Sequence, residues 1–173
     1  MYEVDEHDRV VQILDVPQSS VGAPLPLVMA REGRLVLSYL AENRHPDWDG
    51  TNPRVVDEDS HEPVAVVDFQ RARAHMFGPP NDEAFVGHPL ASRGLGPYRA
   101  YRIERSSWLR RLERMNSVHR YHDPERYWTL THFVFGFHDS TFECIAQSFS
   151  VEVVPGPLSV ASEHARQLLL NTP

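Results

Sequence analysis

The residues best suited to chemistry gather in one aromatic stretch, residues 132–144. It contains His132, His138 and Glu143 among four phenylalanines. An imidazole titrates near neutral pH, and a carboxylate can orient it, so a histidine–glutamate pair is suited to general acid–base catalysis. Two imidazoles and one carboxylate are also a ligand set of catalytic zinc and non-haem iron sites. Both chemistries depend on how the backbone presents these side chains.

An antiparallel hairpin would sort this stretch into an apolar face and a polar face, because side chains alternate along a strand. With Asp139-Ser140 as a two-residue turn, the predicted pairs on the polar face are His138 with Thr141, Gly136 with Glu143, Val134 with Ile145, and His132 with Gln147. The predicted apolar face holds Phe133, Phe135, Phe137, Phe142, Cys144 and Ala146. A slip of one residue would bury Glu143 among the aromatic rings, which is unfavourable for a charged group. Gly136 leaves room for a ligand or for another backbone segment.

His132 and His138 cannot bind one metal ion, because six residues of extended strand span about 20 Å. A site must therefore combine one of them with residues from other segments. Further histidines are His88, His119 and His122, and the last two share a helical face if the preceding helix extends that far. Metal binding by such a combination is one interpretation. Histidines bonded to backbone at element ends explain the same pattern, so we assign no metal ligand and leave the cofactor open.

We expect a polar pocket between the hairpin and the glycine- and proline-rich segment 78–97. A loop of that length inside a compact domain is uncommon and is often functional. The expected catalytic residues are His138, Glu143 and His88. The expected ligand-binding residues are His119, His122, Asn116 and Trp108. This pocket would bind a small polar ligand and could support acid–base or metal-assisted catalysis.

Composition excludes several enzyme classes. All 17 basic residues are arginine, which rules out lysine Schiff bases, lysine-anchored pyridoxal phosphate and the P-loop. No Gly-x-Ser-x-Gly sequence is present, which argues against the usual serine hydrolase elbow. The single cysteine, Cys144, cannot form an intrachain disulfide. Its place on the predicted aromatic face also makes it a poor nucleophile.

Charge and hydropathy bear on partners and location. The net charge of −7 argues against nucleic-acid binding, which depends on neutralising phosphates. No apolar run approaches the roughly 20 residues that a membrane span needs. The first thirty residues lack the pattern of a signal peptide. We therefore expect a soluble, cytoplasmic protein that binds neither nucleic acid nor membrane.

A competing interpretation is a non-catalytic protein-interaction module that uses an acidic surface. Residues 42–62 carry seven carboxylates, three of them consecutive in Asp57-Glu58-Asp59, and would attract a basic partner. Trp48, Tyr121 and Trp128 are candidates for exposed aromatic contacts. The run Asp47-Trp48-Asp49-Gly50 does not have the spacing of a calcium loop. A homodimer formed through an uncovered sheet is a third interpretation.

The apolar periodicity predicts one α+β domain over residues 1–173, with a mostly antiparallel sheet and two principal helices. The predicted strands are 9–16, 27–30, 35–41, 63–69, 71–77, 98–103, 131–138 and 141–154. One helix begins at Trp108, with Ser107 as its N-cap or Ser106 as the alternative. A short helical turn follows Asp123, and a terminal amphipathic helix spans 158–169.

Overall fold

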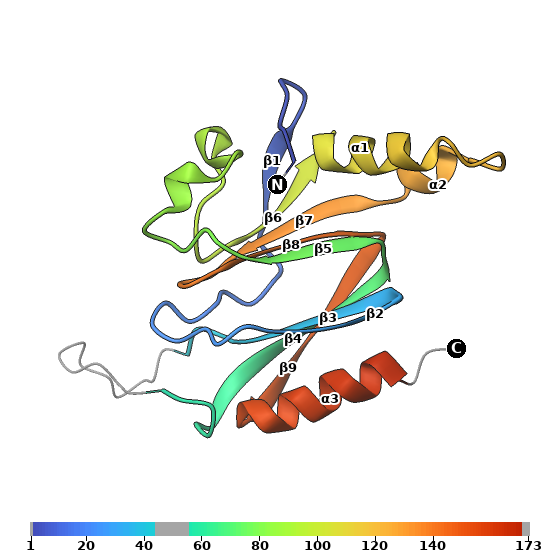
Figure 1. Ribbon diagram of the computed structural model, residues 1–173. Helices are drawn as coiled ribbons and strands as arrows, with labels where there is room; N and C mark the ends of the chain where they lie inside the picture. Colours follow the sequence, from blue (N-terminus) through green and yellow to red (C-terminus); the bar gives the residue numbers. More distant parts are fainter. Residues whose placement is uncertain (1, 44–55, 171–173) are drawn as a thin grey trace.

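The computed structural model describes residues 2–43 and 56–170, and its architecture is α+β (Figure 1). The strands are antiparallel, as predicted, but they form two sheets that pack face to face and not the single sheet expected. The five-stranded sheet has the order β1-β6-β7-β8-β5, formed by Arg9–Ile13, Ala100–Glu104, Thr131–Gly136, Thr141–Ala146 and Ala74–Gly78. The four-stranded sheet has the order β2-β3-β4-β9, formed by Leu27–Arg31, Gly33–Leu40, Glu62–Ala72 and Ser148–Gly156.

Three α-helices and two short 3-10 helices complete the described part of the chain. They are α1 (Ser107–Asn116), α2 (Glu125–Trp128), α3 (Leu158–Leu170), η1 (Phe85–Gly87) and η2 (Ala91–Arg93). Helix α3 covers the outer face of the four-stranded sheet, and α1 lies over the outer face of the five-stranded sheet (Figure 1). Within residues 2–43 and 56–170, no helix combines the length and apolar content that a bilayer crossing requires.

The aromatic face of the β7–β8 hairpin forms the core between the two sheets, as predicted. Phe133, Phe135 and Phe142 are buried there against Phe69 of β4 and the β3 side chains. Burying such rings contributes about 1.5–3 kcal/mol each, which fixes the inward face of both strands. The opposite face of the hairpin carries His132 and Glu143 and lies beneath α1, the 3-10 helices and the N-terminal segment.

The predicted hairpin register is wrong by two residues. The observed pairs include His132 with Ile145, Val134 with Glu143, and Gly136 with Thr141, so His138 and Asp139 form the turn. A shift of two residues preserves which side chains share a face, because the side-chain period of a strand is also two. The predicted faces are therefore correct although the predicted partners are not.

The predicted strand 141–154 is two strands in different sheets. β8 ends at Ala146, the chain turns at Gln147, and β9 continues in the other sheet. The chain also changes sheet between β4 and β5 at Arg73. Two backbone hydrogen bonds join the segments in which the chain changes sheet. The Arg73 N–H donates to the Ile145 carbonyl at 2.8 Å, and the Gln147 N–H donates to the Gln70 carbonyl at 2.9 Å. Paired strands thus bend together from one sheet into the next, a common way of building a corner.

Helix α1 begins one residue earlier than predicted. The Ser106 hydroxyl accepts the Leu109 N–H at 3.2 Å and is the N-cap, whereas the Ser107 N–H donates to Asp8 Oδ1 at 2.6 Å. The helix ends at Asn116, so His119 lies beyond it and shares no helical face with His122. The terminal helix and the short helix after Asp123 are confirmed.

Candidate functional site

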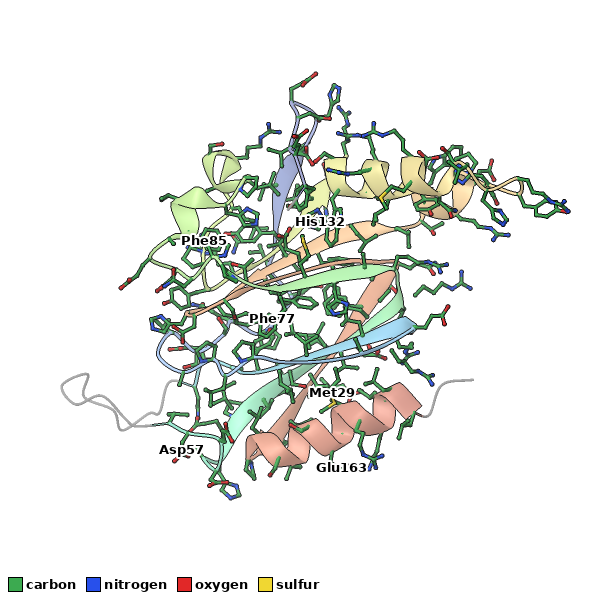
Figure 2. All side chains as sticks on the ribbon, viewed as in Figure 1. Met29, Asp57, Phe77, Phe85, His132 and Glu163 are labelled. Atoms are coloured by element: carbon green, nitrogen blue, oxygen red, sulfur yellow. The ribbon has the colours of Figure 1, made fainter. Side chains whose placement is uncertain are left out.

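Glu143 is the centre of a buried polar cluster between the five-stranded sheet and its cover (Figure 2 labels His132 within it). Its Oε2 accepts the Tyr2 hydroxyl at 2.6 Å and lies 2.8 Å from His132 Nε2. Its Oε1 lies 3.2 Å from His88 Nε2. Three donors from distant parts of the chain therefore surround one carboxylate, which is what a buried charge requires.

Hydrogen bonds to both ring nitrogens fix the tautomers of His88 and His132. The Leu90 N–H donates to His88 Nδ1 at 3.1 Å, so the proton of a neutral His88 is on Nε2 and faces Glu143. The ionised Glu143 can only accept, so His132 donates to it from Nε2. The Nδ1 of the neutral His132 ring then accepts from the Ser106 hydroxyl, 2.9 Å away. The cluster is a set of neutral imidazoles around one carboxylate.

The electrostatics agree with that assignment. Burial acts to raise the pKa of Glu143, but the hydrogen bonds from His132, His88 and Tyr2 outweigh it and lower the pKa to about 2. Burial lowers the pKa of His132 and keeps the ring neutral. The pKa of Tyr2 is raised by burial and by the negative charge of Glu143, so its hydroxyl remains a donor. The pKa shifts of His132 and Glu143 therefore agree with a neutral His132 ring beside an ionised Glu143.

This arrangement is a closed structural network. The side chains of His88 and His132 are fully buried, and that of Glu143 is nearly so. Trp108 stacks on Tyr2 with ring centroids 5.5 Å apart and meets His132 edge-on at 5.0 Å. Because the proton of His88 is on Nε2, that nitrogen has no lone pair for a metal ion. Residues 2–43 and 56–170 hold no group of three side chains arranged to bind one.

A second polar group lies at the hairpin turn and is partly open to solvent. The Tyr98 hydroxyl donates to Asp82 Oδ2, and His138 Nδ1 lies 2.8 Å from the Tyr98 oxygen and 3.1 Å from Asp82 Oδ2. The hydrogen bond from Tyr98 lowers the pKa of Asp82, while burial and the bond to Asp82 raise the pKa of Tyr98 to about 12. The Nδ1 of His138 is thus held by Asp82, and its Nε2 lies 3.9 Å from Asp139 Oδ1.

A cavity of about 340 Å³ lies beside this group, where the two sheets end. Its volume is within the range of small-molecule sites. The residues that line it come from the end of β1 and the following loop, from β3, and from the approaches to β6 and the β7 turn: Gln12, Ile13, Leu14, Val16, Pro17, Gln18, Ser19, Tyr39, Tyr98, Arg99, Ala100, Phe135, Gly136 and Phe137.

Gly136 allows one wall of this cavity to form. A Cβ at Gly136 would lie 2.9 Å from Pro97 Cα and 3.0 Å from the Gly96 carbonyl oxygen, so only glycine lets that segment cross the hairpin. The prediction that Gly136 admits another backbone segment is thus confirmed. Tyr98, which follows the crossing, has a φ of 59°, a conformation uncommon for a residue with a side chain. Strained residues of this kind concentrate at functional sites.

The expected pocket residues divide into three groups. His88, Glu143 and Trp108 come together in the buried cluster, and His138 lies with Asp82 and Tyr98. Asn116 is the last residue of α1, and His119 and His122 follow it. There His122 Nε2 lies 2.6 Å from Glu113 Oε1, and His119 is exposed. The structure therefore does not gather these residues around one pocket, because the end of α1 lies beside α2 and the start of β7, away from the turn that carries His138 (Figure 1).

Several residues of both sites were not among the expected ones. Tyr2 and Ser106 complete the buried cluster, and Tyr98 and Arg99 line the cavity. The positive φ of Tyr98 could not be predicted, because a tyrosine in the sequence does not indicate that backbone conformation. Arg99 directly precedes a strand and gives no periodic signal.

The acidic segment of the alternative interpretation is described only in part. Asp57, Glu58 and Asp59 are exposed, as are Tyr121 and Trp128. Trp48 and the run Asp47-Trp48-Asp49-Gly50 lie outside the described residues.

Comparison of the chain with protein-family models, curated proteins and solved structures found no match in any of the three.

Proposed function

We propose that this protein binds a small polar molecule bearing an acidic group, in the cavity lined by Tyr98 and Arg99. The observation that carries the proposal is the charge of the wall. Arg99 is the one charged side chain among the described residues that line the cavity. It is exposed and forms no ion pair with the described residues. An unpaired guanidinium beside a concave surface favours a carboxylate, which it can bind through two parallel hydrogen bonds.

The remaining wall supplies further polar contacts. Gln12, Gln18 and Ser19 belong to it, and the buried Ser19 hydroxyl has no hydrogen-bond partner within the described residues. A buried hydroxyl without a partner is costly, so a ligand group that bonds to it would gain stability. The aromatic residues Tyr39, Phe135 and Phe137 also line the cavity. The preferred ligand is therefore an acid whose body has both polar groups and an apolar surface.

Acid–base catalysis on that ligand is the second candidate function, and His138 is its base. The side chain of His138 is 42% exposed, whereas those of His88 and His132 are fully buried. The hydrogen bond from Nδ1 to Asp82 orients the ring, as a carboxylate orients a catalytic imidazole. Tyr98 links this pair to the cavity, because its ring lines the wall and its hydroxyl contacts both residues.

The test of binding is a calorimetric titration with benzoate, 4-hydroxybenzoate and pyruvate, alongside the neutral analogue benzamide. We expect at least one acid to bind, and benzamide to bind more weakly than benzoate. Arg99→Gln should weaken the acid at least about tenfold, the loss expected for a charge-assisted pair. Arg102→Gln is the matched control, because Arg102 is exposed on β6 and lies outside the cavity wall.

Two results would contradict the proposal. In the first, none of the three acids binds. In the second, Arg99→Gln and Arg102→Gln bind the acid equally well, which would show that the guanidinium of Arg99 is not the anion contact. Turnover of a bound acid that is lost in His138→Gln, with binding retained, would support the catalytic candidate. Binding without any turnover would leave binding alone as the function.

A further inference from the structure

The cavity wall at Tyr98 is in contact with a group of ionisable side chains that lie outside the wall. The Tyr98 hydroxyl donates to Asp82 and lies 2.8 Å from His138 Nδ1. The two ring nitrogens of His138 face one carboxylate each, Nδ1 that of Asp82 at 3.1 Å and Nε2 that of Asp139 at 3.9 Å. Tyr98 is therefore shared between the cavity and a group of two carboxylates and one imidazole.

Hydrogen bonds hold this group in a fixed place beside the wall. The Arg99 carbonyl accepts the Gly136 N–H at 3.0 Å, which anchors the segment of Tyr98 and Arg99 to the hairpin. The Asp82 N–H donates to the His138 carbonyl at 2.8 Å, which ties the loop that carries Asp82 to the turn. The two carboxylates and the imidazole thus keep their position relative to the wall whether or not a ligand is bound.

The charge of the group changes in the pH range where histidine titrates. The hydrogen bond from Tyr98 lowers the pKa of Asp82, so that carboxylate stays ionised throughout this range. Burial and the bond to Asp82 raise the pKa of Tyr98 to about 12, so its hydroxyl stays neutral. With a neutral His138 ring the group carries the negative charges of Asp82 and Asp139. With a protonated ring, one of these two charges is offset.

This change in charge affects an anionic ligand in the cavity. Such a ligand is attracted by Arg99 and repelled by Asp82 and Asp139, and a proton on His138 reduces that repulsion. Arg99 itself keeps its charge at every pH of interest, because a guanidinium is not deprotonated in proteins. The proton and the acid therefore favour each other's binding, and the coupling between the two sites is reciprocal.

We propose that ligand binding in this cavity is proton-coupled, with His138 taking up a proton when an acid binds beside Arg99. The inference rests on the proposed function and specifies how that site is regulated. A fall in pH favours the loaded site, and a rise in pH favours release of the acid. Because the His138 side chain is 42% exposed and water screens its charge, the gain in affinity is about threefold.

The test is isothermal titration calorimetry of the whole chain with benzoate, 4-hydroxybenzoate and pyruvate. Titrations at about pH 5.5 and about pH 8 bracket the ordinary histidine pKa, and the carboxylates of the three acids stay ionised at both. We expect the dissociation constant of the bound acid to be about threefold lower at the lower pH. Near the ordinary histidine pKa, titrations in two buffers of different ionisation enthalpy should show net proton uptake. Circular dichroism establishes that the chain is folded at each pH.

Three variants identify the proton acceptor and the sign of the effect. His138→Gln should bind the acid equally well at both pH values and without proton uptake. His61→Gln is the matched control and should behave like the unmodified protein, because His61 is exposed and lies outside the cavity wall. Asp82→Asn keeps an oxygen that can accept from Tyr98 but removes a repelling charge. It should therefore bind the acid more tightly at high pH, whereas loss of a merely structural contact would weaken binding.

The outcomes distinguish this proposal from the one on which it rests. An acid that binds through Arg99 with the same affinity at both pH values and without proton uptake would overturn the coupling and leave the binding function intact. So would coupling that persists in His138→Gln, or weaker binding of the acid by Asp82→Asn. If none of the three acids binds at either pH, both proposals are wrong.

Discussion

His132 and Glu143 form a diagonal pair across the β7–β8 hairpin, with Nε2 2.8 Å from Oε2 although Ile145 and Val134 are their partners in register. Diagonal neighbours in an antiparallel pair lie within reach of long side chains. The register of an Asp139-Ser140 turn would put Glu143 opposite Gly136 and separate the carboxylate from the imidazole. The pair therefore helps to select between the two registers, a role in specificity that buried polar groups have in some other folds.

Replacing the central carboxylate should destabilise the fold strongly. In Glu143→Gln the new amide nitrogen must face a Tyr2 or histidine donor, so at least one buried donor loses its acceptor. We expect a loss of about 3 kcal/mol in the free energy of unfolding, measured by urea denaturation. Glu104→Gln, at the partly exposed end of β6, should change it by less than about 0.5 kcal/mol. Equal effects of the two variants would contradict a central role for Glu143.

Stability should fall in two steps as the pH is lowered. The folded state keeps His132 neutral, so its stabilisation is complete above the usual histidine pKa of 6.5 and declines below it. The folded pKa of Glu143 is about 2 against a usual 4.5, so its contribution of about 3 kcal/mol is complete above 4.5 and is lost between 4.5 and 2. Urea denaturation at a series of pH values should resolve both steps.

A matched variant and a salt series assign the lower step. Glu143→Gln should flatten the pH dependence between 4.5 and 2 while retaining the step below 6.5. The pKa of Glu163 is also about 2, because Arg166 bonds to it, but that pair is exposed and salt should screen it. A lower step that disappears in high salt would instead point to surface pairs.

A methyl group at Gly136 should disturb both the fold and the cavity. The added Cβ would meet Pro97 Cα at 2.9 Å, a contact that only a backbone shift can relieve. We expect Gly136→Ala to lower the free energy of unfolding by about 1–3 kcal/mol in chemical denaturation. Gly87→Ala is the control, because a Cβ added at Gly87 would meet nothing within 4 Å and its φ is not positive. Similar losses of stability in the two variants would mean that the Gly96-Pro97 segment is not tightly packed against Gly136.

Cys144 should be unreactive in the native protein. It is fully buried on the aromatic face, and burial together with the negative charge of Glu143 raises the pKa of its thiol well above the ordinary value. Mass spectrometry after treatment with iodoacetamide should show no adduct on the folded chain and complete modification in urea. Rapid modification without denaturant would reveal frequent opening of the core.

The faces of the hairpin could be predicted from the sequence, whereas its pairing could not. Alternation alone separates Phe133 and Phe135 from His132, since burial of aromatic rings dominates that choice. The turn residues decide the register, and Asp139-Ser140 and His138-Asp139 lack the glycine that would distinguish them. The polar cluster that resolves the choice depends on Tyr2 and His88, which are remote in sequence.

The candidate site was predictable only in part for a related reason. The polar face of the hairpin and its cover by segment 78–97 follow from local pattern, and both are confirmed. The separation of His138 from Glu143 results from the two-residue change in register. The cavity arises where the β1 loop meets Tyr98 and Arg99, a tertiary contact without any local periodicity. Likewise, the switch of strand 141–154 between sheets requires the paired bend at Arg73 and Gln147.

The order in which the strands alternate between the two sheets has a consequence for biosynthesis. β4 completes its pairing only with β9, and β1 pairs only with β6, so neither sheet can close before its late strands have been synthesised. Pairings this remote in sequence are slow to form and leave strand edges exposed in the meantime. During translation the interior of both layers therefore stays uncovered until β6, β7, β8 and β9 have been synthesised.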